Sequence, residues 1–314
     1  MFISALVPAL AIVAPVFTLV ALGYGVARTG LVSAKAGGGL SEYVFVLAIP
    51  ALLFRTVTGS PLPDINPLPY WTAYFFGLVA CWIIAGRIAR RLGREPRESA
   101  IIGFAAAQSN TVMIGIPLIL GIFGEAGTVP IIMLLVIHSP LTMTAVALLI
   151  ARDEAGGGAG WRLLRAIFTN PILLSIGAGL IWRQTGMPIP AVMKSVLKFL
   201  GDTAAPCALV AMGMSMIEAS IAGNKRLIGT VAALKLLLHP LLAYVLAVPV
   251  FHLPPVYAAS AILFAACPTG INAYLLAQRY RSGESVTSGA ITLTTILAIV
   301  TMTIAVSVVT GLGK

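Results

Sequence analysis

Long stretches without a single charged residue constrain this chain more than any other feature. Six of them are 22 to 43 residues long: Met1–Ala27, Ile65–Gly86, Ser99–Gly124, Ala126–Ala151, Leu236–Gln278 and Ser285–Gly313. A helix needs roughly 20 apolar residues to cross the hydrocarbon core of a bilayer. Only 10% of the residues are charged, against about 25% in a typical soluble domain. The sequence therefore predicts an all-α integral membrane protein that crosses a lipid bilayer several times.

Basic residues gather in alternate loops between the apolar segments. The chain has 20 Lys and Arg against 10 Asp and Glu, a net charge of +10. Counted loop by loop, 14 basic residues fall on one side and 5 on the other, while Lys235 lies inside a helix. Because Lys and Arg concentrate in cytoplasmic loops, we expect ten spans with the N-terminus and the C-terminus both outside. This clustering leaves no basic face for a nucleic-acid partner.

Charges, Gly/Pro clusters and run lengths divide the chain into ten expected transmembrane helices. Their approximate ranges are 3–27, 38–58, 69–92, 98–122, 128–151, 161–183, 195–218, 226–250, 256–280 and 285–311. Helices 1 to 5 and helices 6 to 10 resemble each other at an offset of 156 residues. Matched pairs at this offset include Pro15 with Pro171, Gly23 with Gly179, and Pro50 with Pro206. Because five is odd, the second repeat must be inverted in the membrane, which predicts two five-helix domains, residues 1–151 and 152–314.

The fourth helix of each repeat is interrupted near its middle, at residues 108–117 and at residues 267–272. Proline removes a backbone hydrogen bond from a helix, and unpaired backbone at bilayer depth is tolerated only beside a cavity or within protein. Two such breaks in corresponding positions are typical of a transporter binding site. The half-helix after each break presents free N–H groups and about half a positive charge. A small organic anion, most simply a carboxylate, fits there.

The candidate substrate-binding residues are the polar, Gly and Pro residues of the two breaks. They are Ser109, Asn110, Thr111, Gly115 and Pro117 in the first break, and Pro268, Thr269, Gly270 and Asn272 in the second. Each Asn side chain offers two N–H donors and one acceptor. A competing interpretation is that the Asn and Ser residues only cap the broken helices. The two glycines are expected to permit a bend and a close approach of the backbones.

Lys235 lies nine residues into the expected helix 226–250, at a depth of roughly 12 Å, and His239 follows it one turn later on the same face. Ionisable residues at membrane depth are costly and are functional candidates, so this pair could attract an anion or carry a proton. The alternative is that Lys235 extends to the inner interface while His239 caps a kink at Pro240. His138 is expected to be a satisfied packing residue. Asp202 is expected near the outer end of helix 7.

Motifs for other chemistries are missing from the sequence. It contains no His-Glu-x-x-His, no Gly-x-Gly-Asp and no Walker loop, so we expect that the protein is not an enzyme. Cys81, Cys207 and Cys267 all lie inside apolar runs, without metal-ligand spacing or a disulfide framework. No cofactor and no metal site are predicted.

The string from Asn110 to Leu118, Asn-Thr-Val-Met-Ile-Gly-Ile-Pro-Leu, followed by Gly121-Ile-Phe-Gly-Glu125, resembles the auxin efflux carrier family. This family includes bacterial malonate and malate carriers and the plant PIN-type exporters. The second break, Pro268-Thr-Gly-Ile-Asn-Ala-Tyr-Leu-Leu-Ala277, is similar to the bacterial branch. The resemblance extends through the ten-helix layout and places the family's two crossovers at Asn110 with Pro117 and at Pro268 with Asn272.

This resemblance implies a sodium/bile-acid symporter-like or NhaA-like fold, with broken helices 4 and 9 crossing inside a moving transport domain. It implies that helices 3–5 and 8–10 form that domain, that helices 1, 2, 6 and 7 form a scaffold that often dimerises, and that an elevator-type motion carries a weak-acid anion. The bacterial inner membrane is the implied location. The short loop between helices 5 and 6 and the presence of Asn272 favour a small mono- or dicarboxylate over auxin. Alternatives are a sodium-coupled symporter of the bile-acid type, and a channel or receptor without alternating access.

Overall fold

A computed structural model describes residues 2–59, 65–151, 168–217 and 223–311. Within these residues the protein is all-helical, and an isolated backbone bridge between Ser109 and Thr269 is the only extended pairing. Seven stretches in this part of the chain are long and apolar enough to cross a membrane. The prediction of an all-α integral membrane protein is thereby confirmed.

The helices of the first half follow the expected ranges closely. They are α1 (Phe2–Arg28), a continuous α2 (Ala34–Tyr43), η1 (Val44–Ala48) and α3 (Ile49–Gly59), α4 (Pro67–Arg91), α5 (Pro96–Ala107), η2 (Thr111–Gly115) with α6 (Ile116–Phe123) and η3 (Gly124–Gly127), and α7 (Thr128–Ala151). Proline begins α4 and α5, where its missing N–H costs nothing. Asn66 adds a side-chain cap to α4, accepting from the Leu68 amide.

The second half is built from the same kinds of element. They are α9 (Pro171–Gln184), α10 (Ala191–Ser215), a continuous α11 (Lys225–Ala233), η4 (Leu234–Leu238), α12 (His239–Val245) and η5 (Leu246–Val250), α13 (Pro255–Ala266), α14 (Asn272–Tyr280) and α15 (Glu284–Val309). Of the helix expected over 161–183, the described part is α9, which begins at Pro171 with Asn170 as its cap and follows a short break after the helical residue Phe168. Residues 161–167 lie outside the described residues.

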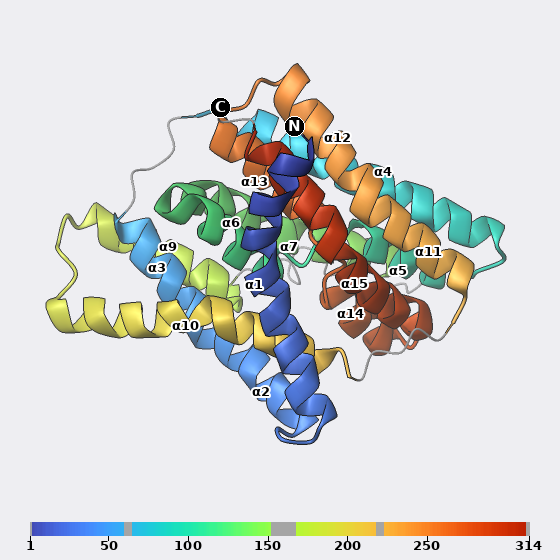
Figure 1. Ribbon diagram of the computed structural model, residues 1–314, viewed down its shortest axis with the longest axis horizontal. Coiled ribbons are helices and arrows are strands. Elements are labelled where there is room, and N and C mark those ends of the chain that lie inside the picture. Colours follow the sequence, from blue (N-terminus) through green and yellow to red (C-terminus); the bar gives the residue numbers. More distant parts are fainter. Residues whose placement is uncertain (1, 60–64, 152–167, 218–222, 312–314) are drawn as a thin grey trace.

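The helices pack as two groups, and the break between α5 and η2 lies where the groups meet. In the first group α10 packs against α1, α2 and α3, and α9 packs against α3. In the second group α4 packs against α5 and α12, and α13 and α11 pack against α15. Figure 1 shows α1 crossing the middle of the molecule, with α3, α9 and α10 on one side of it and α4, α11 and α12 on the other. The groups meet where α1 packs on α15 and α6, and where α10 packs on η2.

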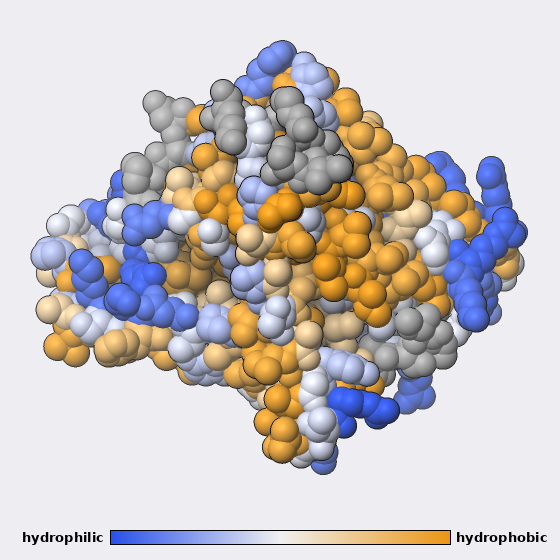
Figure 2. Space-filling view, viewed as in Figure 1, coloured by the Kyte–Doolittle hydropathy of each residue, from blue (hydrophilic) through white to orange (hydrophobic). Residues whose placement is uncertain are grey.

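The molecule exposes large apolar side chains along several helices. Phe76 of α4, Leu241 of α12 and Val300 of α15 are each more than half exposed. Figure 2 shows apolar residues over much of the visible face and hydrophilic residues gathered at its margins. A soluble monomer rarely exposes such extended apolar surface, so these faces are the ones that contact lipid.

Candidate functional site

The two helix breaks meet and pair with each other. Residues 108–110 and residues 268–270 run antiparallel, with a bridge between Ser109 and Thr269. Two backbone hydrogen bonds connect them, from Asn110 N to Pro268 O (2.8 Å) and from Gly270 N to Gln108 O (2.9 Å). Each break thus satisfies backbone groups that the other exposes. This mutual pairing explains how two interrupted helices can be stable inside the apolar core.

Glycine is required where the breaks approach each other. A Cβ atom on Gly115 would lie 2.7 Å from two ring carbons of Phe264. A Cβ atom on Gly270 would lie 3.0 Å from the Ser109 carbonyl oxygen. Both glycines therefore have the close-approach role that the sequence suggested, and Pro117 is buried just after the first break, in α6.

Asn110 is buried and acts as a cap. Its side-chain oxygen accepts a hydrogen bond from the Met113 amide (3.2 Å), at the start of η2. Its amide nitrogen lies 3.2 Å from the Met212 sulfur on α10. The capping interpretation is thus correct for the oxygen, whereas the nitrogen has, within the described residues, only a weak sulfur acceptor. This nitrogen is the polar group of Asn110 that a stronger acceptor, such as a carboxylate, would attract.

The hydroxyl residues of the breaks are held by neighbouring helices. The Tyr74 hydroxyl of α4 donates to Ser109 Oγ (3.0 Å). Thr269 Oγ1 donates to the Ala105 carbonyl (3.1 Å), and the Thr269 amide donates to Thr294 Oγ1 of α15 (3.1 Å). Thr111 is buried in the first turn of η2. These contacts fix the breaks in position and engage the hydroxyl groups of Ser109 and Thr269 with protein.

Asn272 differs from Asn110 because it faces open space. It is the first residue of α14, it is only partly buried, and it lines a cavity of about 540 Å³. Among the described residues its side chain makes no hydrogen bond and caps no helix. Asn272 therefore offers its amide to whatever occupies the cavity.

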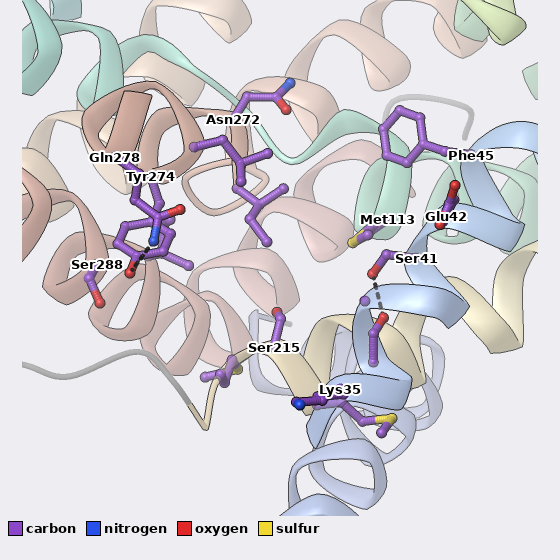
Figure 3. A pocket seen from close by; sticks show the side chains of 17 residues that line it. Lys35, Ser41, Glu42, Phe45, Met113, Ser215, Asn272, Tyr274, Gln278 and Ser288 are labelled. Carbon is purple, nitrogen blue, oxygen red and sulfur yellow. Dashed lines mark hydrogen bonds between the residues drawn. The ribbon is translucent and has the colours of Figure 1, made fainter. Parts of the chain in front are cut away.

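The cavity lies between the two helix groups and has apolar walls with a few polar groups. Its lining includes Phe45, Met113, Met214, Ile271 and Ile291, together with Lys35, Ser41, Glu42, Ser215, Asn272, Gln278 and Ser288. Figure 3 shows Asn272 and Lys35 at opposite ends of this space, with Glu42 and Met113 along one wall. Lys35 and Glu42 are the basic and the acidic residue of its lining, and its inner end, opposite Lys35, is formed by residues of the breaks.

Lys235 and His239 are both fully buried, so the alternative interpretation, in which Lys235 extends to the interface, is wrong. The Lys235 ammonium donates to the Ala265 carbonyl in the last turn of α13 (2.6 Å) and lies 3.2 Å from His239 Nδ1. His239 Nε2 lies 3.2 Å from the Tyr74 carbonyl. Lys235 turns inward because α13 ends at the break, and the free carbonyls of that helix end attract a cation. His239 contacts these groups and does not cap a kink.

Three buried polar residues beside the breaks were missed or misjudged in the sequence. Tyr74 is completely buried and links His239 to Ser109. Among the described residues both ring nitrogens of His138 are buried without a hydrogen-bond partner, so this residue is not the satisfied packing residue that we expected. Gln108 Oε1 likewise has no partner in this part of the chain. The sequence carries no signal for Tyr74, because a tyrosine in an apolar run is ordinary.

Asp202 lies away from the breaks, in a second cavity of about 550 Å³ that also contains Glu125 and Lys194. It pairs with Arg55 at 3.2 Å and with Lys198. Asp202 is in the middle of α10 and not near the helix end as expected, because α10 begins at Ala191. Among the described residues no group of three or more His, Cys, Asp or Glu side chains is placed to hold a metal ion.

Comparison with known proteins gives matches along nearly the whole chain. A family model described as "Membrane transport protein" matches residues 8–162 and 159–306. The chain is 28% identical over 305 residues to a Rhizobium meliloti protein named "Putative malonate transporter", covering 93% of each chain. It is 27% identical over 298 residues to an "Uncharacterized transporter" of Methanothermobacter thermautotrophicus, covering 91% of this chain and 94% of the relative.

Proposed function

Because the chain belongs to the membrane transport protein family, which is the auxin efflux carrier family, we propose that it is a secondary carrier of small organic anions. The family and the similar proteins are transporters and not enzymes. Mono- or dicarboxylates such as malonate or malate are the proposed substrates. The name of the Rhizobium meliloti relative, which refers to malonate, supports this choice.

The observation that carries the proposal is the pairing of the two breaks at the inner end of a cavity. The N-terminus of α14 and the unoccupied amide of Asn272 both lie at this cavity, and both favour an anion. Met113 and Ile271 provide apolar surface for the body of a small acid. Asn110 belongs to the break that pairs with residues 268–270, and the Met212 sulfur is the one acceptor of its side-chain N–H among the described residues.

The proposed architecture is a ten-helix inverted repeat that works by alternating access. In this scheme α1, α2–α3, α9 and α10 form the scaffold, and the group containing α4 to α7 and α11 to α15 moves as the transport domain. The separate packing of these two groups supports the division. Exposed apolar residues on α9 and α10, such as Ile181 and Phe199, support a homodimer through the scaffold.

We propose that this structure is open to the cytoplasm and that the protein resides in a bacterial inner membrane with both termini outside. The cavity contains Lys35, which belongs to the more basic side of the chain. Arg55 and Lys194 lie on the less basic side and line the second cavity, which would be the outer vestibule.

A binding assay on the purified protein across a panel of neutral, cationic and carboxylate solutes tests the substrate class. We expect saturable binding of small carboxylates and none of neutral analogues such as the corresponding diamide. Binding of neutral or cationic solutes alone would refute the anion assignment. Counterflow in proteoliposomes distinguishes a carrier from a channel. Only a carrier accumulates labelled solute against its own concentration gradient while unlabelled solute, loaded beforehand, leaves the vesicles.

A further inference from the structure

Lys235 is surrounded by groups that suit a protonated amine. Its two hydrogen-bond partners are the Ala265 carbonyl and His239 Nδ1. The Tyr74 carbonyl can only accept, so His239 Nε2 must carry the imidazole proton and donate to it. His239 Nδ1 is then an acceptor directed at the Lys235 nitrogen. Both partners therefore accept hydrogen bonds from Lys235, and the C-terminal end of the α13 dipole adds negative potential.

No carboxylate compensates the charge of Lys235 within the described residues. The titratable groups around it are Tyr74 and Cys81 on α4, His138 on α7, His239 on α12 and Cys267 after α13. Every Asp and Glu side chain that the structure describes is at least partly exposed and belongs to another region. A buried charge without a counter-ion is costly. The helix end and His239 therefore offset only part of this cost.

We propose that Lys235 is a fixed positive charge that balances the charge of a bound monovalent anion while the transport domain crosses the membrane. This inference rests on the function proposed above. Lys235 contacts α13 and is linked through His239 to α4, so it moves with the breaks and not with the scaffold. None of its partners lines the cavity. Lys235 acts on the anion through its electrostatic field and without direct contact.

The charge balance has a kinetic consequence. A domain loaded with a monovalent anion crosses with zero net charge, whereas the empty domain must return with one uncompensated positive charge. Exchange of one anion for another uses only loaded crossings. We therefore expect exchange of monovalent anions to be faster than net uptake and insensitive to membrane potential. A dianion would leave the loaded domain with one negative charge.

The test measures exchange in proteoliposomes containing the full chain, with the potential set by potassium and valinomycin. Labelled monomethyl malonate (monovalent) and labelled malonate (divalent) are each exchanged at pH 7 and at saturating concentrations on both sides. Wild-type exchange of the monoester should not change with potential. Exchange of malonate should slow by up to about 4-fold at 100 mV of either sign, because the slower of the two loaded crossings then limits the cycle.

Lys235→Met removes the charge with a side chain of similar length, and Lys225→Met makes the same change at an exposed position earlier on the same helix. Lys235→Met should make exchange of the monoester sensitive to potential by up to about 4-fold at 100 mV. Lys225→Met and Lys235→Arg should leave it insensitive. A loss of packing alone would lower the rate at every potential and would not create this sensitivity.

Two results would overturn the charge balance while leaving the carrier function intact. One is wild-type monoester exchange that already depends on potential, and the other is Lys235→Met exchange that remains independent of it. If Lys235→Met does not fold, the wild-type comparison of monoester with malonate decides alone. Absence of any carboxylate exchange by the wild-type protein would instead refute the proposed function, and the inference with it.

Discussion

Replacing each break asparagine by alanine separates substrate contact from helix capping. The Asn272 side chain faces the cavity and makes no hydrogen bond among the described residues, so Asn272→Ala removes no contact within the protein. Asn110 caps η2 through the Met113 amide, so Asn110→Ala removes a cap as well as an amide beside the proposed site. We expect Asn272→Ala to leave thermal stability unchanged and Asn110→Ala to lower it.

The magnitudes follow from these contacts. Loss of a hydrogen bond to a charged group costs about 1 to 3 kcal/mol, which corresponds to about 5- to 150-fold weaker carboxylate binding for each variant. Loss of the cap at Asn110 adds about 1 kcal/mol of destabilisation. Asn224 is a matched control, because it caps α11 through the Arg226 and Leu227 amides and lines neither cavity.

Binding affinity and apparent melting temperature are measured on the same purified preparations of Asn110→Ala, Asn272→Ala and Asn224→Ala. Asn224→Ala should melt earlier and bind carboxylate as the wild type does. If Asn272→Ala retained wild-type affinity, the cavity at the breaks would not be the anion site. If Asn110→Ala lost stability but no affinity, its role would be capping alone.

Two further predictions concern the packing at the breaks and the coupling ion. Gly115→Val should destabilise the protein by about 1 to 3 kcal/mol, measured as a lower melting temperature, because its Cβ would collide with Phe264. Gly121→Val is the control, because a Cβ at Gly121 has open space around it, and it should leave the melting temperature unchanged. Equal effects of the two variants would show that valine in a helix, and not the collision with Phe264, causes the loss. Carboxylate uptake at fixed pH and potential should be unchanged when choline replaces sodium, because the buried Lys235 ammonium beside the breaks disfavours a second cation there; an absolute requirement for sodium would contradict this.

The positions of the helices and of the breaks could be predicted because they depend on local sequence. Charge-free runs of about 25 residues define spans. Pro, Gly and Asn inside such a run mark an interruption of the helix whatever its tertiary neighbours are. Ranges for nine of the ten expected helices agree with the structure to within a few residues. For the helix expected over 161–183, the structure describes only the part from residue 168 onward, in which α9 begins at Pro171 after the cap at Asn170.

The partners of the buried polar side chains could not be predicted, because most of them are backbone groups. Lys235 binds the carbonyl of Ala265, and His239 binds that of Tyr74. Every residue has a carbonyl, so the sequence does not distinguish these two. Burial of Lys235 depends on where α13 ends in space, which is a property of the packed fold and not of the hydropathy around residue 235.

The bridge between the breaks also has a consequence for biogenesis. Asn110 N and Gln108 O, which are both in the first half, find their partners about 160 residues later, at Pro268 and Gly270. When only the first five helices have been inserted, these polar groups have no partner at a depth where water cannot replace one. Neither half can therefore mature alone in the bilayer. The second half supplies the backbone hydrogen-bond partners that the first half lacks. The site therefore forms only after the chain has been synthesised beyond residue 270.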